Sequence, residues 1–355
     1  MTRPRVLLAT ESVRAGNGGI ARVARLMAKV LGERTDPVTG IAFSDPQPSS
    51  DLGVSFRTAR GSRTRYVLEV NRAIPTHTHF VYDCLGMSRA HQWLPIPHRP
   101  SLAYVHGIEV WTGTAHSKQV AAAPRMTHLL SNSLHTRDRA AELDPRFARA
   151  EVCWLATESD DPPASTPRTG GPPRVTIVGR VVPNRYKGHD ELFRAWPAVL
   201  AAVPDAVLTV AGTGPALPQV RKLAAELGLP ENQVEFRGFV PEAVMPQLWA
   251  ETTVFAMPSR GEGFGLVYIE AMRHSVPVIG SVHDAAPEVN LDGVTGYNVD
   301  LTRPSQLADR LIHLLRNRDE ASRLGANGFR RWQTAFRYSA FRSRFEPILN
   351  RFLSR

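Results

Sequence analysis

The chain has 355 residues, of which 43% are hydrophobic and 21% charged. This length and composition allow two domains with cores of their own and exclude a small disulfide scaffold or a disordered chain. The longest apolar runs, such as residues 198–203, are far shorter than the roughly 18 residues that cross a bilayer, so we expect no membrane-spanning helix and a cytoplasmic protein. Cys84 and Cys153 have neither metal-ligand nor redox spacing, which fits a reducing compartment.

The positive charge is unevenly distributed. The 43 basic and 33 acidic residues give a net charge of +10, with +6 in residues 1–170, −2 in 171–327 and +6 in 328–355. Such ends attract anions: nucleic acid, an anionic membrane surface or a phosphorylated small molecule. Because no zinc spacing, recognition helix or RNA-binding aromatic motif occurs, we expect no nucleic-acid partner. Only four of the basic residues are lysines, so much of the arginine charge is expected to be solvated surface.

Both halves begin with the same order of elements. Residues 6–9 form a short apolar run, residues 16–19 a glycine-rich turn, and residues 20–31 carry apolar side chains at helical spacing. After residue 173 the pattern restarts with a strand, a helix and a second strand at residues 207–211. Alternating strands and helices predict an α/β fold with two Rossmann-like, doubly wound domains.

A linker separates the two predicted domains. Residues 158–173 contain five prolines and two glycines in 16 residues, which is typical of a linker. We therefore expect a first domain at 1–157, a second at 174–327, and a basic helical tail at 328–355 that packs back on the first domain. In such folds ligands bind beyond the carboxyl ends of the strands, so we expect the site in a central cleft that both domains face.

The segment SRGEGFGLVYIEAM, residues 259–272, is the most informative for chemistry. It follows a strand candidate at residues 254–257 and enters a helix near Leu266. The backbone amides of Gly263, Phe264 and Gly265, with the first free N–H groups of the helix, predict a phosphate site.

Two glutamates flank this helix start. With Glu262 in the loop and Glu270 in the helix, both can face a ligand, Glu270 accepting from ribose hydroxyls and Glu262 from a sugar hydroxyl. The alternative is that both are solvated surface residues, but the surrounding glycines favour the functional interpretation.

A second motif, GRVVPNRYKGHDEL, spans residues 179–192 after the first strand of the second domain. Arg180 and Lys187 are placed to neutralise a departing diphosphate. Arg180 alone is also compatible with surface charge, whereas Lys187 stands out in a lysine-poor chain. No two aspartates are separated by one residue, so the Asp-x-Asp arrangement that holds a divalent ion is missing. We therefore expect no metal and no cofactor, with Arg180, Lys187 and the helix start in place of magnesium.

In the first domain, His106 follows an apolar strand candidate at residues 102–105 and precedes a glycine. This strand-end position favours a substrate contact over a structural histidine. Asp83 and Glu109 are weaker candidates from nearby loops. Gly18 and Gly19 open the first helix and are expected to approach the same diphosphate.

Together these motifs resemble the retaining glycosyltransferases of family four, which have the fold called GT-B. The resemblance rests on GRVVPNRYKGHDEL, VEFRGFVP, the glutamate pair and APEVNLDGVTGYNV, and more thinly on GNGGIARVA, AYVHGIEVW and SNSLHTRD. It implies an acceptor-side first domain and a nucleotide-sugar-binding second domain.

The resemblance also implies an activity: metal-free transfer of a hexose, with retained configuration, from GDP-mannose or a UDP-sugar. The acceptor would be a glycan, a lipid-linked molecule or a small molecule in polysaccharide or glycoconjugate biosynthesis. On this view Arg180 and Lys187 hold the diphosphate, Glu270 the ribose, and Glu262 and His106 the donor sugar. Phe239 and Val240 border the base.

Two other functional classes stay open. The spacing Gly16-x-Gly18-x-x-Ala21, with Asp45 after a second strand candidate, fits an NAD-dependent sugar-nucleotide enzyme, and an epimerase could share the architecture. A non-catalytic membrane-surface protein is the third hypothesis. It is motivated by the basic ends and by an arginine cluster, which a peripheral glycosyltransferase could also use and which has solvated surface charge as its alternative: Arg57, Arg60, Arg63, Arg65 and Arg72.

Overall fold

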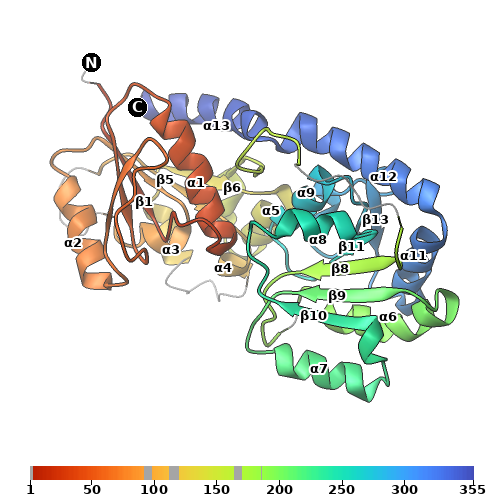
Figure 1. Cartoon of the computed structure of the whole chain (residues 1–355). Coiled ribbons are helices and arrows are strands. Elements are labelled where there is room, and N and C mark those ends of the chain that lie inside the picture. Colours follow the sequence, from red (N-terminus) through yellow and green to blue (C-terminus); the bar gives the residue numbers. More distant parts are fainter. Residues whose placement is uncertain (1–2, 92–97, 112–119, 164–169, 185) are drawn as a thin grey trace. The chain divides into compact units, whose positions relative to one another are not determined.

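The computed structural model describes residues 3–91, 98–111, 120–163, 170–184 and 186–355. The chain divides into two compact units, each built on one sheet with helices packed on it (Figure 1). Unit 1 comprises Met1–Ser159 and Tyr338–Arg355, and unit 2 comprises Asp160–Arg337. The predicted α/β class with two doubly wound domains is confirmed.

Unit 1 contains a seven-stranded parallel sheet in the order β3-β2-β1-β4-β5-β6-β7. The strands are β1 (Val6–Thr10), β2 (Val38–Ala42), β3 (Ser55–Thr58), β4 (His79–Tyr82), β5 (Ser101–Val105), β6 (His128–Ser131) and β7 (Glu151–Val152). The helices are α1 (Gly18–Gly32), α2 (Arg63–Ala73), α3 (Leu85–Ser88), α4 (Ile108–Trp111), η1 (Val120–Arg125), α5 (Leu134–Leu143), η2 (Pro145–Arg149) and the returning α13 (Tyr338–Leu353).

Unit 2 contains a six-stranded parallel sheet in the order β10-β9-β8-β11-β12-β13. The strands are β8 (Arg174–Val178), β9 (Val207–Ala211), β10 (Val234–Gly238), β11 (Val254–Ala256), β12 (Val278–Ser281) and β13 (Gly296–Val299). The helices are α6 (His189–Ala202), α7 (Leu217–Glu226), η3 (Glu231–Gln233), α8 (Met245–Glu251), α9 (Leu266–Arg273), α10 (Ala286–Val289), α11 (Pro304–Arg316), α12 (Arg318–Arg331) and η4 (Trp332–Phe336).

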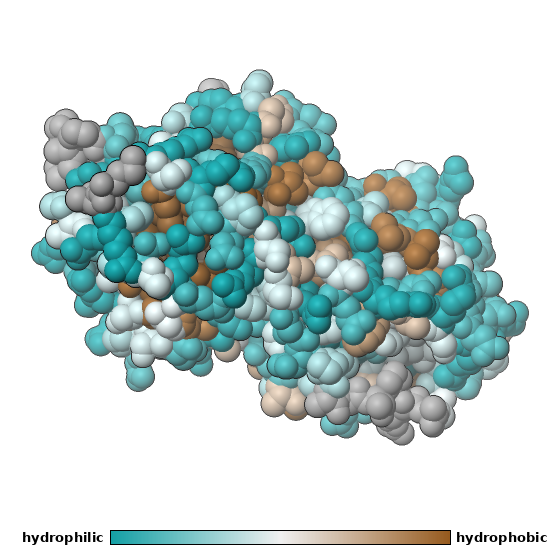
Figure 2. All heavy atoms as spheres, turned by 90° about the horizontal axis from the view of Figure 1, so that it is seen from above, coloured by the Kyte–Doolittle hydropathy of each residue, from teal (hydrophilic) through white to brown (hydrophobic). Residues whose placement is uncertain are grey.

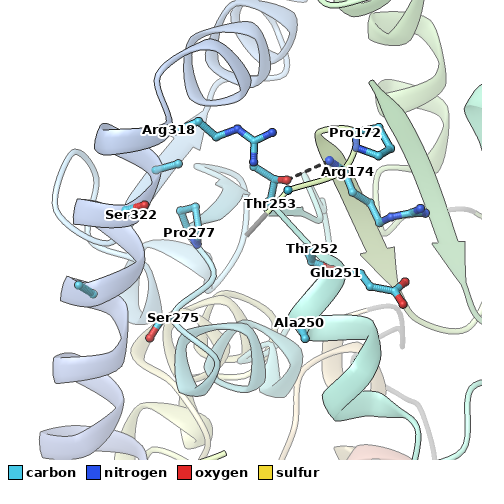
Figure 3. A pocket seen from close by; sticks show the side chains of 14 residues that line it. Pro172, Arg174, Ala250, Glu251, Thr252, Thr253, Ser275, Pro277, Arg318 and Ser322 are labelled. Atoms are coloured by element: carbon cyan, nitrogen blue, oxygen red, sulfur yellow. Dashed lines mark hydrogen bonds between the residues drawn. The ribbon is translucent and has the colours of Figure 1, made fainter. Parts of the chain in front are cut away.

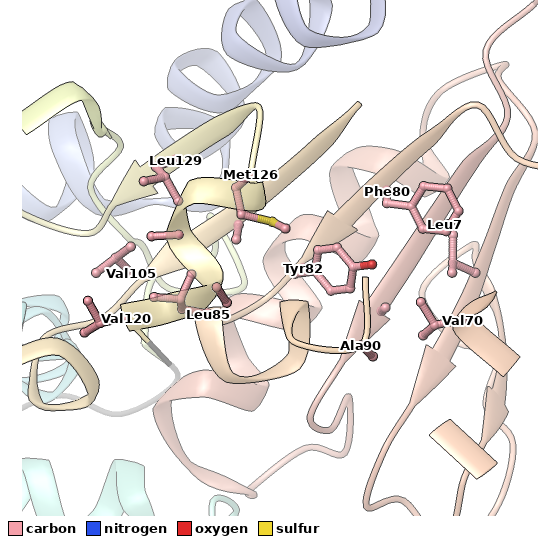
Figure 4. Close-up of a cluster of buried hydrophobic side chains, with 14 of the residues drawn as sticks. Leu7, Val70, Phe80, Tyr82, Leu85, Ala90, Val105, Val120, Met126 and Leu129 are labelled. Carbon is pink, nitrogen blue, oxygen red and sulfur yellow. The ribbon is translucent and has the colours of Figure 1, made fainter. Parts of the chain in front are cut away.

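The inner strands read as unbroken apolar runs because helices cover both faces of the sheets. Every residue of β1 and of β5 is buried, which alternating polar residues would not permit. One face of the unit 1 sheet carries the core shown in Figure 4, where Leu7 and Phe80 lie beside Val70, and Tyr82 lies between this group and Leu85. This rigid sheet fixes the positions of the loops at its carboxyl edge.

The tail that returns to unit 1 is shorter than expected. It begins at Tyr338, whereas residues 328–337 stay with unit 2. The reason is Arg337, whose extended backbone (φ −78°, ψ 162°) separates η4 from α13. Within unit 1, α13 runs beside α1 (Figure 1), with the Tyr338 ring 4.2 Å below Lys29 Nζ and its hydroxyl donating to Glu33 (2.7 Å).

Part of the basic charge of the chain's end is used in packing. Arg331 donates to the carbonyls of Glu288 (2.7 Å) and Val289 (2.8 Å), and Arg344 donates to the Trp154 carbonyl (3.1 Å). These guanidiniums are not available as an anion-attracting surface, which the charge count alone had suggested.

In the part of the chain that is described, every helix is too short or too polar to cross a membrane, as predicted. The face drawn in Figure 2 is mostly hydrophilic, with hydrophobic side chains in small groups.

Candidate functional site

The unit 2 sheet has a switch point between β8 and β11. From β8 the chain adds β9 and β10 on one side, and β11 then starts the other side with β12 and β13. Loops that follow two such neighbouring strands diverge at their carboxyl ends and leave room for a ligand. The loop after β8 carries Arg180 and Lys187, and the loop after β11 carries Glu262 and the glycines before α9.

Lys187 and Glu262 form an ion pair across this switch point. The Lys187 ammonium donates to Glu262 Oε1, and each side chain is only 14% exposed. The ammonium also lies 3.9 Å from Met257 Sδ and 5.3 Å from the centre of the Tyr186 ring. Burial lowers the pKa of Lys187, but the Glu262 carboxylate opposes this and the pKa lies above its ordinary value. Lys187 is therefore a fixed positive charge at the carboxyl ends of β8 and β11.

Two glycines with left-handed backbones shape the loops around this pair. Gly188 (φ 88°) follows Lys187, and a Cβ there would lie 2.3 Å from the carbonyl oxygen of Pro258 in the other loop. Gly265 (φ 84°) caps α9, and a Cβ there would lie 2.3 Å from the buried Tyr268 ring. Only glycine fits either position, and the contact at Gly188 shows that the two loops approach each other closely.

A third loop, after β12, holds the glutamate loop in place through Asp284. Its Oδ2 accepts from the Glu262 amide (3.0 Å) and its Oδ1 from the Ala286 amide (2.9 Å), while the Ala285 amide donates to the Glu262 carbonyl (3.1 Å). Burial raises the pKa of Asp284 to about 7. Sequence reasoning missed this residue. Its only signal is its place just after a strand and just before a short helix.

The amino terminus of α9 is built as the sequence predicted. The helix begins at Leu266, no side chain caps it, and its first turn has no acidic residue. Gly263, Phe264 and Gly265 are buried, and the Phe264 ring packs edge-on against Phe336 with centroids 5.9 Å apart. The first amides of this helix give the switch point a positive dipole end.

The remaining predicted residues of unit 2 lie on three different elements. Arg180 is exposed two residues after β8, and Glu270 is partly buried within α9. Phe239 and Val240 follow β10, which is separated from β8 by β9, and Phe239 is 68% exposed. Their roles stay predictions.

In unit 1 the residues after β1, β4 and β5 converge. Asp83 Oδ2 accepts from the Glu11 amide (2.8 Å), His106 Nε2 contacts the Asp83 carbonyl oxygen (2.6 Å), and the His106 amide donates to Glu109 Oε1 (2.9 Å). The three residues that the sequence singled out here therefore lie together. Because the partner of Nε2 is a carbonyl oxygen, Nε2 carries the hydrogen and Nδ1 keeps a lone pair.

Burial favours the neutral form of each group in this cluster. It lowers the pKa of His106 to about 4, raises that of Glu109 to about 7 and raises that of Asp83 well above its usual range. The His106 ring also stacks on Tyr104, with centroids 5.4 Å apart and planes at 5°. A neutral, oriented imidazole can accept a hydrogen bond from a hydroxyl without adding charge.

The glycine loop of unit 1 gives less support for a ligand-binding site. Gly18 and Gly19 begin α1 and are exposed. Both carboxylate oxygens of Asp45 accept hydrogen bonds within the protein, from the Ser12 hydroxyl and from the Val13 amide (2.9 Å). This disfavours Asp45 as the ribose-binding acid of the dinucleotide hypothesis.

A cavity of about 240 Å³ lies at the opposite edge of the unit 2 sheet (Figure 3). Its walls come from the first residues of β8, from residues just before β11 and β12, and from α12; the Arg174 amide donates to Thr253 Oγ1 (3.0 Å). It lies at the amino-terminal ends of the strands, away from the loops that carry Lys187 and Glu262. Among the described residues, no group of three or more His, Cys, Asp or Glu side chains is arranged to hold a metal ion.

The solved structures most informative for the fold are glycosyltransferases. Anabaena HepE in complex with UDP and glucose superposes with a TM-score of 0.80 at 17% identity, over 98% of this chain and 99% of that one. Sucrose-phosphate synthase from Thermosynechococcus elongatus gives 0.80 at 18% identity, over 99% and 100%. The chain therefore has the GT-B fold.

Sequence comparison supports the same class. The family model described as Glycosyl transferases group 1 matches residues 172–317. A GDP-mannose-dependent alpha-(1-6)-phosphatidylinositol monomannoside mannosyltransferase of Mycolicibacterium smegmatis is 38% identical over 170 residues, which are 46% of this chain and 44% of that protein. The protein of the same description from Mycobacterium tuberculosis is 36% identical over 219 residues, 57% and 56%. The chain thus spans about half the length of the curated relatives it matches.

The fold and the sequence matches point to the same class of protein. The fold is that of GT-B glycosyltransferases, and residues 172–317 match the family model of the glycosyl transferases group 1. The resemblance to family-four glycosyltransferases is confirmed.

Proposed function

We propose that the protein is a glycosyltransferase that transfers mannose from GDP-mannose, with retained configuration and without a metal ion. The observation that carries this proposal is the buried Lys187–Glu262 pair at the switch point of unit 2, beside the uncapped start of α9. The named relatives, which use GDP-mannose, support this donor over a UDP-sugar.

The ion pair suggests how the donor is received. When a diphosphate enters, its oxygens compete with Glu262 for the Lys187 ammonium, and the α9 amides and Arg180 add further donors. Glu262 then becomes free to accept a hydrogen bond from a hydroxyl of the transferred sugar. The same cation and dipole stabilise the negative charge that develops as the diphosphate leaves, which is the largest electrostatic term in such a reaction.

The remaining assignments complete the proposal. Glu270 accepts from the ribose, Phe239 and Val240 border the base, and Gly18 and Gly19 are further candidates for a diphosphate contact. His106 accepts from a hydroxyl of the donor sugar through Nδ1, because its Nε2 is engaged with the Asp83 carbonyl. The acceptor is a lipid-linked molecule, as the names of the relatives suggest, and the protein works in the cytoplasm at the membrane face.

Turnover with candidate donors tests the proposal. The full chain is incubated with GDP-mannose, UDP-glucose or UDP-galactose and a lipid-linked acceptor, with and without EDTA, and the anomeric configuration of the product is read by NMR. We expect an α-mannoside from GDP-mannose and no loss of rate with EDTA. Formation of an epimer from the donor alone would indicate an epimerase, NAD binding would indicate the dinucleotide class, and a rate abolished by EDTA would contradict the metal-free site.

A further inference from the structure

The arginine cluster of unit 1 is divided by the structure into two parts. Arg57 and Arg72 both pair with Glu69, at 3.1 and 3.2 Å, and these three side chains line one small cavity. Arg63 is exposed and lines a different, larger groove. The cluster is therefore not one uniform basic surface.

This groove lies between α2, the α3 region and η1 of unit 1 and has a volume of about 500 Å³, within the roughly 300–1,000 Å³ of small-molecule sites. Its floor is apolar and adjoins the core in Figure 4, in which Ala90 is labelled. The apolar lining includes Phe43, Val67, Met87, Ala90, Ala121 and Ala122.

The rim of the groove is positively charged. Arg63, Arg89 and Arg125 line it, and all three are exposed. Among the described residues, no acidic side chain pairs with Arg63 or Arg125, in contrast to Arg57 and Arg72. Two such guanidiniums at the edge of an apolar groove complement a ligand with an anionic head and an apolar tail.

A largely buried tyrosine also lines the groove. The Tyr66 side chain lines it and is only 4% exposed, and its hydroxyl has no hydrogen-bond partner among the described residues. Because this hydroxyl is itself inaccessible, Tyr66 contributes ring surface and not a polar contact to the groove.

We propose that this groove binds one molecule of an anionic phospholipid, with an acyl chain on the apolar floor and the phosphate between Arg63 and Arg125. This inference rests on the proposed function: the groove would bind the lipid part of the acceptor, or a lipid of the membrane that holds it, on unit 1. It concerns a single bound lipid and not general attraction to a charged surface, to which every exposed arginine of the cluster, Arg72 included, would contribute.

Binding of monomeric short-chain lipids to the full chain tests the site. Dihexanoyl phosphatidylglycerol, kept below its micelle concentration, is titrated by calorimetry against dibutanoyl phosphatidylglycerol, dihexanoyl phosphatidylcholine and glycerol phosphate. Each buried methylene tightens binding about three- to fourfold, so the seated chain should gain about tenfold from two methylenes. Glycerol phosphate, which has no chain, should bind far more weakly.

Matched variants separate the groove from surface charge. Arg63→Gln and Arg125→Gln should each weaken binding about tenfold, and Ala121→Trp, which fills the groove from an exposed position, should abolish it. Arg72→Gln removes the same charge from the same helix and should leave binding unchanged. Equal losses in Arg63→Gln and Arg72→Gln, or binding without dependence on chain length, would overturn the proposal.

The result is independent of the catalytic assignment. GDP binding is titrated on the same variants and should equal that of the unmodified chain, because none of the groove residues is among those proposed to bind the nucleotide. Lipid binding without sugar transfer would contradict the proposed function alone. Transfer without binding of monomeric lipid, or attachment only to vesicles, would contradict the groove alone.

Discussion

Lys187 and Glu262 lie on loops that follow two different strands, β8 and β11, and meet as a largely buried ion pair where the strand order of the unit 2 sheet divides. The two residues are 75 positions apart in the chain. Their pairing holds a fixed cation against the loop that leads into α9. A diphosphate bound at this loop could contact both the lysine and the amino-terminal amides of the helix.

Replacing this lysine should slow catalysis strongly. We expect Lys187→Ala to lower kcat/KM about 100- to 1000-fold, the usual cost of losing one donor to a developing negative charge. The matched control is Lys222→Ala, because Lys222 is 76% exposed and its ion pair with Glu226 lies on the surface, one helical turn away. Steady-state turnover of both variants decides this, and equal activities would remove Lys187 from the site.

Replacing Gly265 with alanine should destabilise the start of α9. Gly265→Ala must place a Cβ at φ 84° and 2.3 Å from a fully buried tyrosine ring, so we expect a loss of about 2–4 kcal/mol in stability and weaker donor binding. Gly293→Ala has the same backbone strain (φ 68°) with nothing within 4 Å of the new Cβ, and should lose only about 1 kcal/mol. Thermal unfolding with and without GDP compares the two, and similar losses would show that the contact with Tyr268 is unimportant.

The buried Asp284 should make stability depend on pH. Its folded pKa of about 7 lies above the unfolded value of about 3.9, so the folded state holds the proton more tightly. Stability from this group is then fully present below about pH 4 and is lost as the pH rises to about 7, by up to roughly 4 kcal/mol. Asp284→Asn cannot titrate. The difference in unfolding midpoint between it and the unmodified chain should therefore change between pH 4 and 7 and be flat above pH 8; a constant difference would contradict the raised pKa.

His106 should act as a neutral hydrogen-bond acceptor. With a pKa of about 4, it stays uncharged throughout pH 5–9. We expect His106→Asn to lower kcat/KM at least tenfold without moving either limb of the pH profile over that range. His128→Asn, which alters a histidine paired with Glu151 in the same unit, should have little effect on the rate. An acid limb near pH 6.5 that vanishes in His106→Asn would show instead that the imidazole titrates during turnover.

Much of the fold could be predicted because buried parallel strands leave a simple signal. The apolar runs before the glycine loops gave the strands, and the start of α9 at Leu266 follows from Gly265, which alone accepts the left-handed backbone there. The end of the second unit could not be predicted, because neither glycine nor proline marks the break at Arg337 in an otherwise helical, aromatic-rich segment.

The candidate site could be predicted only in part, because the sequence reveals motifs but not which loops meet in the fold. Lys187 and Glu262 stand in motifs with glycines, but that they pair depends on which strands are neighbours. Asp284 was missed because its role is to accept hydrogen bonds from two backbone amides. A buried aspartate with that role leaves no recognisable pattern in the sequence. The arginine cluster was over-interpreted as one surface because a count of charges does not reveal that Glu69 pairs with Arg57 and Arg72.

A crystal structure of the full chain with bound GDP is the most direct measurement of where the diphosphate binds. We predict its phosphate oxygens within hydrogen-bond distance of Lys187 Nζ and of the amides at the start of α9, with the contact between Lys187 and Glu262 opened. Phosphates bound elsewhere, or an intact ion pair beside an occupied nucleotide site, would contradict the account.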